Sequence, residues 1–261
     1  MDSNQLATLR SWFDGYSRSF LTGDSNRDSP ITLKIDHTHR VHSNIRLLAQ
    51  SIGFANSRLR TAEAIGLLHD AGRFEQYRQF GTFNDRRSIN HAALGIHVVE
   101  QAGVLKGLGD DELGLIVEAI RFHNAPALPS TRPPLPLTFM RLIRDADKLD
   151  IWKVFADFYR SDHPPEAAIV QHLVDQPVWE PAIVQAIMQK RLARFSEMKS
   201  VNDFKLLQLS WVFDLNFPET FAQAQNRTDL ALIAATLPDA PELNRAVSVV
   251  MARLREKGRP A

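Results

Sequence analysis

The stretch that decides the fold is Ile65 to Phe74, "IGLLHDAGRF". Its apolar first half continues the helical spacing of the residues before it, which predicts a helix that packs into a core. The run ends in an adjacent histidine and aspartate, His69 and Asp70. A buried carboxylate or imidazolium without a partner is costly, even after the surroundings relax. The stretch therefore raises the question of which partner offsets the burial of these two groups where the helix ends.

The rest of the chain is also helical in pattern. Apolar residues recur at steps of three and four, and strand-like alternation never extends beyond a few residues. We expect an all-α protein. The polar segment 22–30, "TGDSNRDSP", predicts a loop ended by its proline, and a helix is expected from Asp36, with His37 at its start. The proline-rich stretch 124–137, "NAPALPSTRPPLPL", predicts a long loop.

Length and composition limit the classes of protein. The 261 residues, 44% of them hydrophobic, suffice for a substantial core. We expect a single all-α domain over residues 1–261, with a motif-bearing core at about 30–160 and C-terminal helices at about 166–257 packing on it. A net charge of +1 argues against general nucleic-acid binding and against a membrane-surface protein.

No segment has the length and apolarity of a membrane span or the features of a signal peptide. We therefore expect a cytoplasmic protein without a membrane partner, and the sequence also allows a homodimer. The chain has no cysteine, so any metal must be held by nitrogen and oxygen ligands.

Histidine and aspartate side chains recur at the predicted helices, most of them at helix ends. In helical bundles, metal sites are built from such groups on facing helices. Nitrogen and carboxylate ligands together suit Mn, Fe, Mg, Co, Ni or Zn without choosing among them. If all six groups converge, two ions that share a bridging aspartate are the economical arrangement. The candidate ligands are His37, His69, Asp70, His91, His123 and Asp147.

Each of these residues also has an ordinary explanation when it is taken alone. A histidine at a helix end is commonly a cap or a solvated group, and His69 would suit a helix C-terminus. Asp147 could form an ion pair with Lys148, Arg144 or Arg141. Spacing alone leaves a shared metal site and separate structural roles both open.

Three motifs carry a resemblance to a known family. "HTHRV" at 37–41 resembles the H-x-x-R-V opening of the HD superfamily of metal-dependent phosphohydrolases. "LLHDAGR" at 67–73 resembles its paired His-Asp motif, and "RDADKLD" at 144–150 its closing aspartate motif. The chain is similar to bacterial members and lacks the "GYP" signature of the cyclic-di-GMP phosphodiesterase branch. The resemblance implies an HD-domain helical bundle with extra N- and C-terminal helices.

The resemblance also implies a ligand set. His37, His69, Asp70 and Asp147 match the ligands of the first metal. The residue at the position of Asp70 bridges to a second metal in dinuclear members, and two further histidines, here His91 and His123, complete that site. The family thus implies one or two divalent ions per chain.

The closing motif holds two candidate aspartates, Asp145 and Asp147. We favour Asp147, because it directly precedes the Lys-Leu pair of the family pattern. Asp145 and Asp150 would then support a ligand or form ion pairs.

The activity implied by the resemblance is hydrolysis of a phosphate ester of a small metabolite or nucleotide, as a phosphomonoesterase or phosphodiesterase, by a metal-activated water. Asp70, Arg73 and Lys148 are the candidate catalytic residues. Two alternatives remain open, a mixed di-iron oxygenase with the same six ligands and a non-catalytic HD-fold sensor or binding module. Candidate contacts to the phosphorylated substrate are Arg73, Arg86, Arg87 and Asn124.

Overall fold

The structure is a computed structural model that describes residues 1–161 and 173–258. Helices dominate these residues, and they contain no β-strand, only one isolated parallel bridge between Val174 and Ser200. The all-α prediction is confirmed. The chain divides into two compact units, Met1–Asp150 and Ile151–Ala261. None of the helices in the described residues combines the length and the apolarity needed to cross a membrane.

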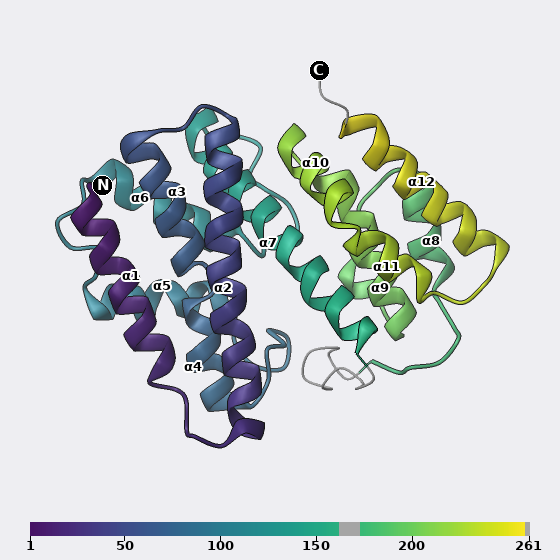
Figure 1. Cartoon of the computed structure of the whole chain (residues 1–261), viewed down its shortest axis with the longest axis horizontal. Helices are drawn as coiled ribbons and strands as arrows, with labels where there is room; N and C mark the ends of the chain where they lie inside the picture. The colour runs from purple at the N-terminus through teal and green to yellow at the C-terminus, as the bar shows by residue number, and fades with distance from the viewer. Residues whose placement is uncertain (162–172, 259–261) are drawn as a thin grey trace. The chain divides into compact units, whose positions relative to one another are not determined.

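The first unit is a bundle in which α2 packs on α3, α4 on α5, and α6 on both α3 and α5 (Figure 1). The helix α1 packs mainly on α3. The last helix of this unit, α7, extends beyond the unit boundary. The helices are α1 (Ser3–Arg18), α2 (Ser25–Ser51), α3 (Asn56–Leu68), α4 (Ala71–Phe80), α5 (His91–Ala102), α6 (Asp110–Phe122) and α7 (Pro134–Arg160).

The predicted loop over 22–30 is wrong, because α2 already begins at Ser25. The side chain of Asp24 caps the helix by accepting hydrogen bonds from the backbone N–H groups of Asn26 and Arg27. Short polar residues favour both loops and N-caps, which explains the error. Pro30 lies inside the helix. His37 therefore lies well inside α2 and not at its start.

The predicted loop over 124–137 is too long, because α7 begins at Pro134. The first N–H groups of a helix have no partner within the helix, so prolines in the first turn cost little. Thr138 Oγ1 donates a hydrogen bond to the Pro134 carbonyl oxygen at 2.9 Å, within this first turn. The prolines here begin a helix, and the ligand-bearing part of α7 follows without a break.

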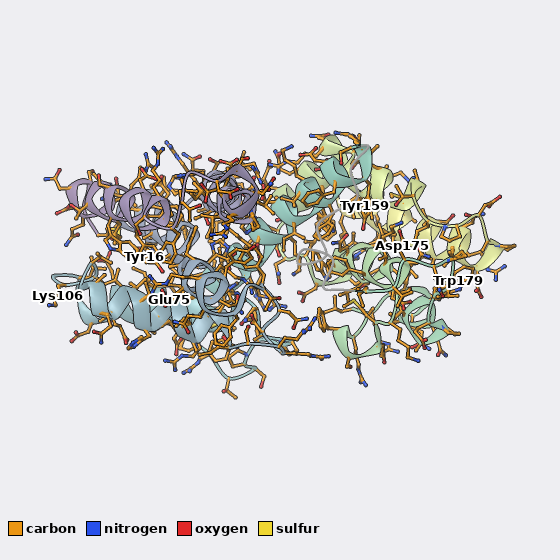
Figure 2. All side chains as sticks on the ribbon, turned by 90° about the horizontal axis from the view of Figure 1, so that it is seen from below. Tyr16, Glu75, Lys106, Tyr159, Asp175 and Trp179 are labelled. Atoms are coloured by element: carbon orange, nitrogen blue, oxygen red, sulfur yellow. The ribbon has the colours of Figure 1, made fainter. Side chains whose placement is uncertain are left out.

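An aromatic cluster joins α1 to α4 near the paired His-Asp motif. Phe74 of α4 lies 5.9 Å from Phe13 and 5.8 Å from Tyr16, measured between ring centroids. Tyr16, labelled in Figure 2, also donates a hydrogen bond to the Ala71 carbonyl oxygen at 3.0 Å. This contact holds the start of α4 directly after the motif.

The second unit has its own core around α9, where every residue is buried. Trp152 Nε1 donates to the Gln208 carbonyl oxygen at 3.0 Å, and Lys205 Nζ lies 4.9 Å from the centroid of the Tyr159 ring. The helices of this unit are α8 (Pro181–Met188), η1 (Phe195–Glu197), α9 (Val201–Ser210), η2 (Trp211–Asp214), α10 (Pro218–Arg227), α11 (Asp229–Ala235) and α12 (Pro241–Lys257).

The helices of the second unit correspond to the predicted C-terminal segment at about 166–257. Its first residues, 166–172, lie outside the described residues. The expectation of a single domain over 1–261 stays a prediction beside the division into two units.

Candidate metal centre

The close approach of α2 and α3 brings the first two candidate ligands together. A Cβ atom on Gly66 would lie 2.7 Å from Ile45 Cγ2 and 3.0 Å from His42 Cα, so only glycine lets the two helices meet at this distance. The helix α2 carries His37, and α3 ends directly before His69. The close contact therefore places these two imidazoles against each other, with ring centroids 5.5 Å apart.

A second glycine, in the paired His-Asp motif itself, positions the start of α5. A Cβ atom on Gly72 would overlap the carbonyl oxygen of His91 and lie 2.5 Å from the Gly95 nitrogen. The first turn of α5 can thus lie directly on α4. Asn90 caps α5 by accepting a hydrogen bond from the Ala93 N–H at 3.0 Å, which fixes the turn that presents His91.

Three of the candidate ligands, His37, His69 and Asp147, lie on one side of the Asp70 carboxylate. His37 Nε2 lies 3.5 Å from Asp70 Oδ2 and 3.2 Å from Asp147 Oδ1. His69 Nε2 lies 3.7 Å from Asp70 Oδ2 and 3.8 Å from Asp147 Oδ1. Ligand atoms that share an ion at about 2.1 Å are separated by about 3 to 4 Å, so the spacing fits one shared cation. His37, His69 and Asp70 form a buried group that could hold a metal.

The remaining candidates converge on the other oxygen of the same carboxylate. Asp70 Oδ1 lies 3.3 Å from His91 Nε2 and 3.8 Å from His123 Nε2. Asp70, His91 and His123 form the second buried group that could hold a metal. Asp70 thus presents Oδ2 to one group and Oδ1 to the other, which is the arrangement of a bridging carboxylate.

All four histidines turn the same ring nitrogen toward this centre. Each Nδ1 has an oxygen partner within 3 Å, so Nδ1 carries the proton and Nε2 presents its lone pair. The Nε2 atoms of His37 and His69 are buried without a hydrogen-bond partner. Buried nitrogen atoms of this kind fit metal ligands. The oxygen partners are Asp150 Oδ2 for His37 (2.7 Å), the Gly66 carbonyl for His69 (2.9 Å), Asp85 Oδ2 for His91 (2.7 Å) and the Ile120 carbonyl for His123 (2.7 Å).

Each of the two carboxylates that orient a histidine is itself held by an arginine. Arg40 donates to Asp150 from Nε at 2.6 Å and from Nη2 at 3.1 Å, a two-point contact. Arg73 Nη1 donates to Asp85 Oδ1 at 2.9 Å. The arginines of "HTHRV" and "HDAGR" thus act at the back of the centre in this structure.

Further amides complete the support of Asp85. Gln76 Nε2 donates to Asp85 Oδ1 at 2.9 Å, and Asn124 Nδ2 donates to Asp85 Oδ2 at 3.1 Å. Because burial opposes ionisation, the hydrogen bond to His91 and the charge of Arg73 are needed to hold the pKa of Asp85 well below its usual range. Asp85 is therefore ionised at neutral pH and accepts a hydrogen bond from the Nδ1–H group of His91.

The pKa values of the buried histidines are shifted in opposite directions. Burial lowers the pKa of His69 to about 4 and that of His91 to about 3, so both rings are neutral at pH 7. Neutral imidazole is the form that binds metals. Burial and the charge of Lys34 also oppose protonation of His37, but the neighbouring carboxylates of Asp147, Asp150 and Asp70 raise its pKa to about 10. A divalent cation shared by these carboxylates would compete with that proton.

Lys34 supplies a positive charge beside the Asp70 carboxylate. In the sequence, only its place about one helical turn before His37 could have pointed to it. Its Nζ lies 2.8 Å from Asp70 Oδ2. Burial opposes ionisation of Asp70, yet Lys34 and His69 hold the pKa of Asp70 well below its usual range. The Lys34 side chain is 17% exposed and Asp147 is 19% exposed, against 4% for Asp70. These two residues mark the open side of the centre.

The remaining candidate catalytic and substrate-binding residues differ in how exposed they are. Arg86 and Arg87 are exposed on the segment between α4 and α5, while Lys148 and Asp145 are buried. Arg73 is 15% exposed and also donates to Gln76 Oε1 at 2.8 Å. The substrate and catalytic roles of these residues stay predictions.

The match to a known family covers the same part of the chain as this centre. Residues 35–152 match the model of the HD domain family. Residues 35–152 of the chain are thus identified as an HD domain. HD domains bind divalent metals and are typical of metal-dependent hydrolases. No curated protein and no solved structure matches the chain.

The extent of the HD domain agrees with the place of the motif residues in the structure. The matched HD domain begins two residues before His37 and ends after Asp150, so it includes every candidate ligand and both orienting carboxylates. Lys34 lies just before the matched range. Asp85 has no place in the three motifs, and only its position six residues before His91 could have pointed to it.

Proposed function

We propose that the protein is a metal-dependent phosphohydrolase with a dinuclear centre, acting on a phosphate ester of a small metabolite or nucleotide. One observation carries the proposal, namely that the two oxygens of Asp70 face two separate groups of buried ligands. Two metals about 3.5–4 Å apart are the usual clamp for in-line attack on phosphorus. A single ion would leave one of the two groups without a partner.

In the proposed enzyme, His37, His69, Asp70 and Asp147 would hold one ion, and Asp70, His91 and His123 the other. When bound, such ions lower the pKa of a coordinated water toward neutrality and offset charge on the phosphoryl oxygens. The ion identity is open among Mn, Fe, Mg, Co, Ni and Zn.

The protein groups around the centre have separate tasks in the proposed reaction. Asp150 and Asp85 hold the Nδ1 protons of His37 and His91, which keeps both Nε2 atoms directed inward. Lys34, on the open side, is suited to donate from Nζ to a phosphoryl oxygen of the substrate. Asp147, also on the open side, would orient the attacking water through its carboxylate.

The contacts of Arg73 favour a positioning role over the predicted contact with the phosphate group. Its Nη1 donates to Gln76 and Asp85, and its Nε lies 3.5 Å from Asp70 Oδ1. These contacts support a role in positioning Asp85 and His91. A direct contact from Arg73 to the phosphate remains part of the proposal and has its own test in the rate of an Arg73→Lys variant at saturating metal.

The proposal is tested by metal analysis followed by a phosphatase assay. Protein purified without chelator should contain about two divalent ions per chain and release phosphate or nitrophenol from chromogenic mono- or diesters. Asp70→Ala should lose both ions and all turnover, because it removes the shared ligand. Iron with oxygen-dependent turnover and no hydrolysis would identify an oxygenase, and wild-type protein that binds no divalent ion would leave only a binding module.

A further inference from the structure

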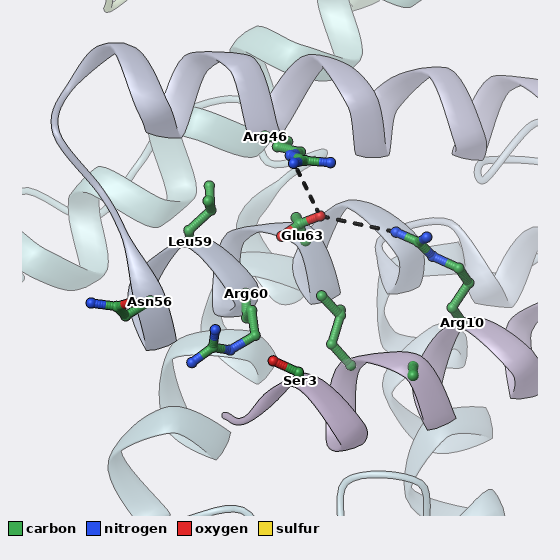
Figure 3. A pocket seen from close by; sticks show the side chains of 9 residues that line it. Ser3, Arg10, Arg46, Asn56, Leu59, Arg60 and Glu63 are labelled. Atoms are coloured by element: carbon green, nitrogen blue, oxygen red, sulfur yellow. Dashed lines mark ion pairs between the residues drawn. The ribbon is translucent and has the colours of Figure 1, made fainter.

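A cavity with a volume of about 310 Å³ lies among α1, α2 and α3, apart from the metal centre. Three arginines from three helices line it, Arg10 on α1, Arg46 on α2 and Arg60 on α3. Figure 3 shows Arg10 and Arg46 reaching toward Glu63 from opposite sides. The candidate metal ligands do not line this cavity, so its chemistry is independent of the metal centre.

The cavity carries more positive charge than its own carboxylate can balance. Glu63 Oε1 lies 4.0 Å from Arg10 Nη2 and 3.9 Å from Arg46 Nε. Charge-assisted hydrogen bonds are normally about 2.7–2.9 Å long, so neither arginine makes a close pair with Glu63. Glu63 is only 8% exposed, whereas Arg10 and Arg46 are 48% and 54% exposed. Their guanidinium groups can therefore meet an incoming ligand.

The neighbouring histidine adds no further positive charge. Arg10 Nη2 lies 3.1 Å from His42 Nε2, which accepts its hydrogen bond. Burial and the charge of Arg10 lower the pKa of His42 to about 4, although Glu63 lies 3.4 Å from the ring. With His42 neutral, three arginines and one glutamate leave a net charge of +2 around the cavity.

The remaining walls of the cavity are apolar. Leu6 and Ala7 of α1 and Leu59 of α3 line it beside the arginines. Its volume lies at the lower end of the range of roughly 300–1,000 Å³ for small-molecule sites. The planar guanidinium group is well matched to carboxylate and phosphate oxygens.

We propose that this cavity binds a small organic anion that presents one carboxylate or phosphate group to Arg10 and Arg46 and a short apolar group to Leu6 and Leu59. The bound anion would supply the negative charge that Glu63 provides only in part. It would also contact α2 and α3, the two helices whose close approach positions His37 and His69.

The test is a calorimetric titration of the full chain with benzoate, phenyl phosphate and inorganic phosphate, each measured at low and high salt. Benzoate and phenyl phosphate should bind saturably, and more tightly than inorganic phosphate, because only they fill the apolar wall. Arg46→Gln and Arg10→Gln should each weaken this binding about tenfold or more, as expected for the loss of a hydrogen bond between charged groups. Both side chains are about half exposed, so these variants retain the core.

A matched control is Arg27→Gln. Arg27 is also on α2 and has a similarly long ion pair, 3.9 Å to Asp24, but it does not line the cavity. This variant should bind the anions as the wild type does. Equal affinity in the Arg46, Arg10 and Arg27 variants would overturn the proposal. Binding that survives in Arg46→Gln but disappears in Asp70→Asn would place the anion at the metal centre and would overturn it as well.

Discussion

The Nε2 atoms of His91 and His123 lie 2.9 Å apart, although both rings already donate their Nδ1 protons to oxygens. Two lone pairs at this distance repel each other unless a proton or a cation lies between them. Two nitrogens bound at right angles to one ion, each at about 2.1 Å, would be about 3 Å apart. The pair therefore has the spacing of two ligands of one metal, and Asp70 Oδ1 lies within 3.8 Å of both.

Replacing one of these two histidines should remove one ion and spare the other. His123→Ala takes a ligand from the second group but leaves His37, His69 and Asp147 unchanged. We expect the metal content to fall from about two ions per chain to about one, measured by inductively coupled plasma mass spectrometry. His97→Ala, on the exposed face of α5, is the control and should retain both ions. A His123→Ala protein that still holds two ions would place this residue outside the centre.

The carboxylates behind the histidines should tune metal affinity without touching the ions. Asp85→Asn and Asp150→Asn weaken the acceptors that fix the Nδ1–H tautomers of His91 and His37. Each substitution should lower metal affinity by about 10- to 100-fold, the usual effect of losing such a partner. The two variants should differ in which ion they lose first in a chelator titration. Identical titrations for both would argue against two distinct groups.

The part of the candidate site around the paired His-Asp motif was largely predictable, because the residues that indicate it are adjacent in the sequence. An apolar helix that ends in His69 and Asp70 needs a buried partner for these groups, and the other two motifs add His37 and Asp147 as candidate ligands. His91 and His123 followed from the family resemblance. Asp85 was not predictable, since its contact with His91 depends on how the segment between α4 and α5 folds back. The start of α2 was mistaken because Asp24 caps the helix in a segment whose composition also suits a loop. Asp28, inside the helix, accepts hydrogen bonds from the N–H groups of Thr22 and Gly23.

The close contact of α4 with α5 gives a stability prediction. Gly72→Ala places a methyl group against the His91 carbonyl and the Gly95 backbone, neither of which is a flexible side chain. We expect the free energy of unfolding to fall by at least about 2 kcal/mol, measured by urea denaturation. Gly114→Ala in α6 is the matched control, because a Cβ there meets nothing within 4 Å. It should leave stability unchanged or raise it by up to about 1 kcal/mol. Equal effects of the two substitutions would show that α4 and α5 do not meet as described.

A substitution of Lys34 would distinguish a role in metal binding from a role in substrate binding. Its Nζ lies 2.8 Å from Asp70 Oδ2 on the open side of the centre, but an ammonium group cannot be a metal ligand. Lys34→Gln should therefore retain both ions while kcat/KM for a phosphate ester falls about 10- to 100-fold, the loss expected for a hydrogen bond between charged groups.

The control for this variant is Lys106→Gln, since Lys106 is exposed at the edge of the first unit (Figure 2). It should match the wild type in metal content and in rate. If Lys34→Gln loses metal together with activity, Lys34 stabilises the ligand arrangement and does not act on the substrate. If it keeps both, the phosphate contact assigned to Nζ is wrong.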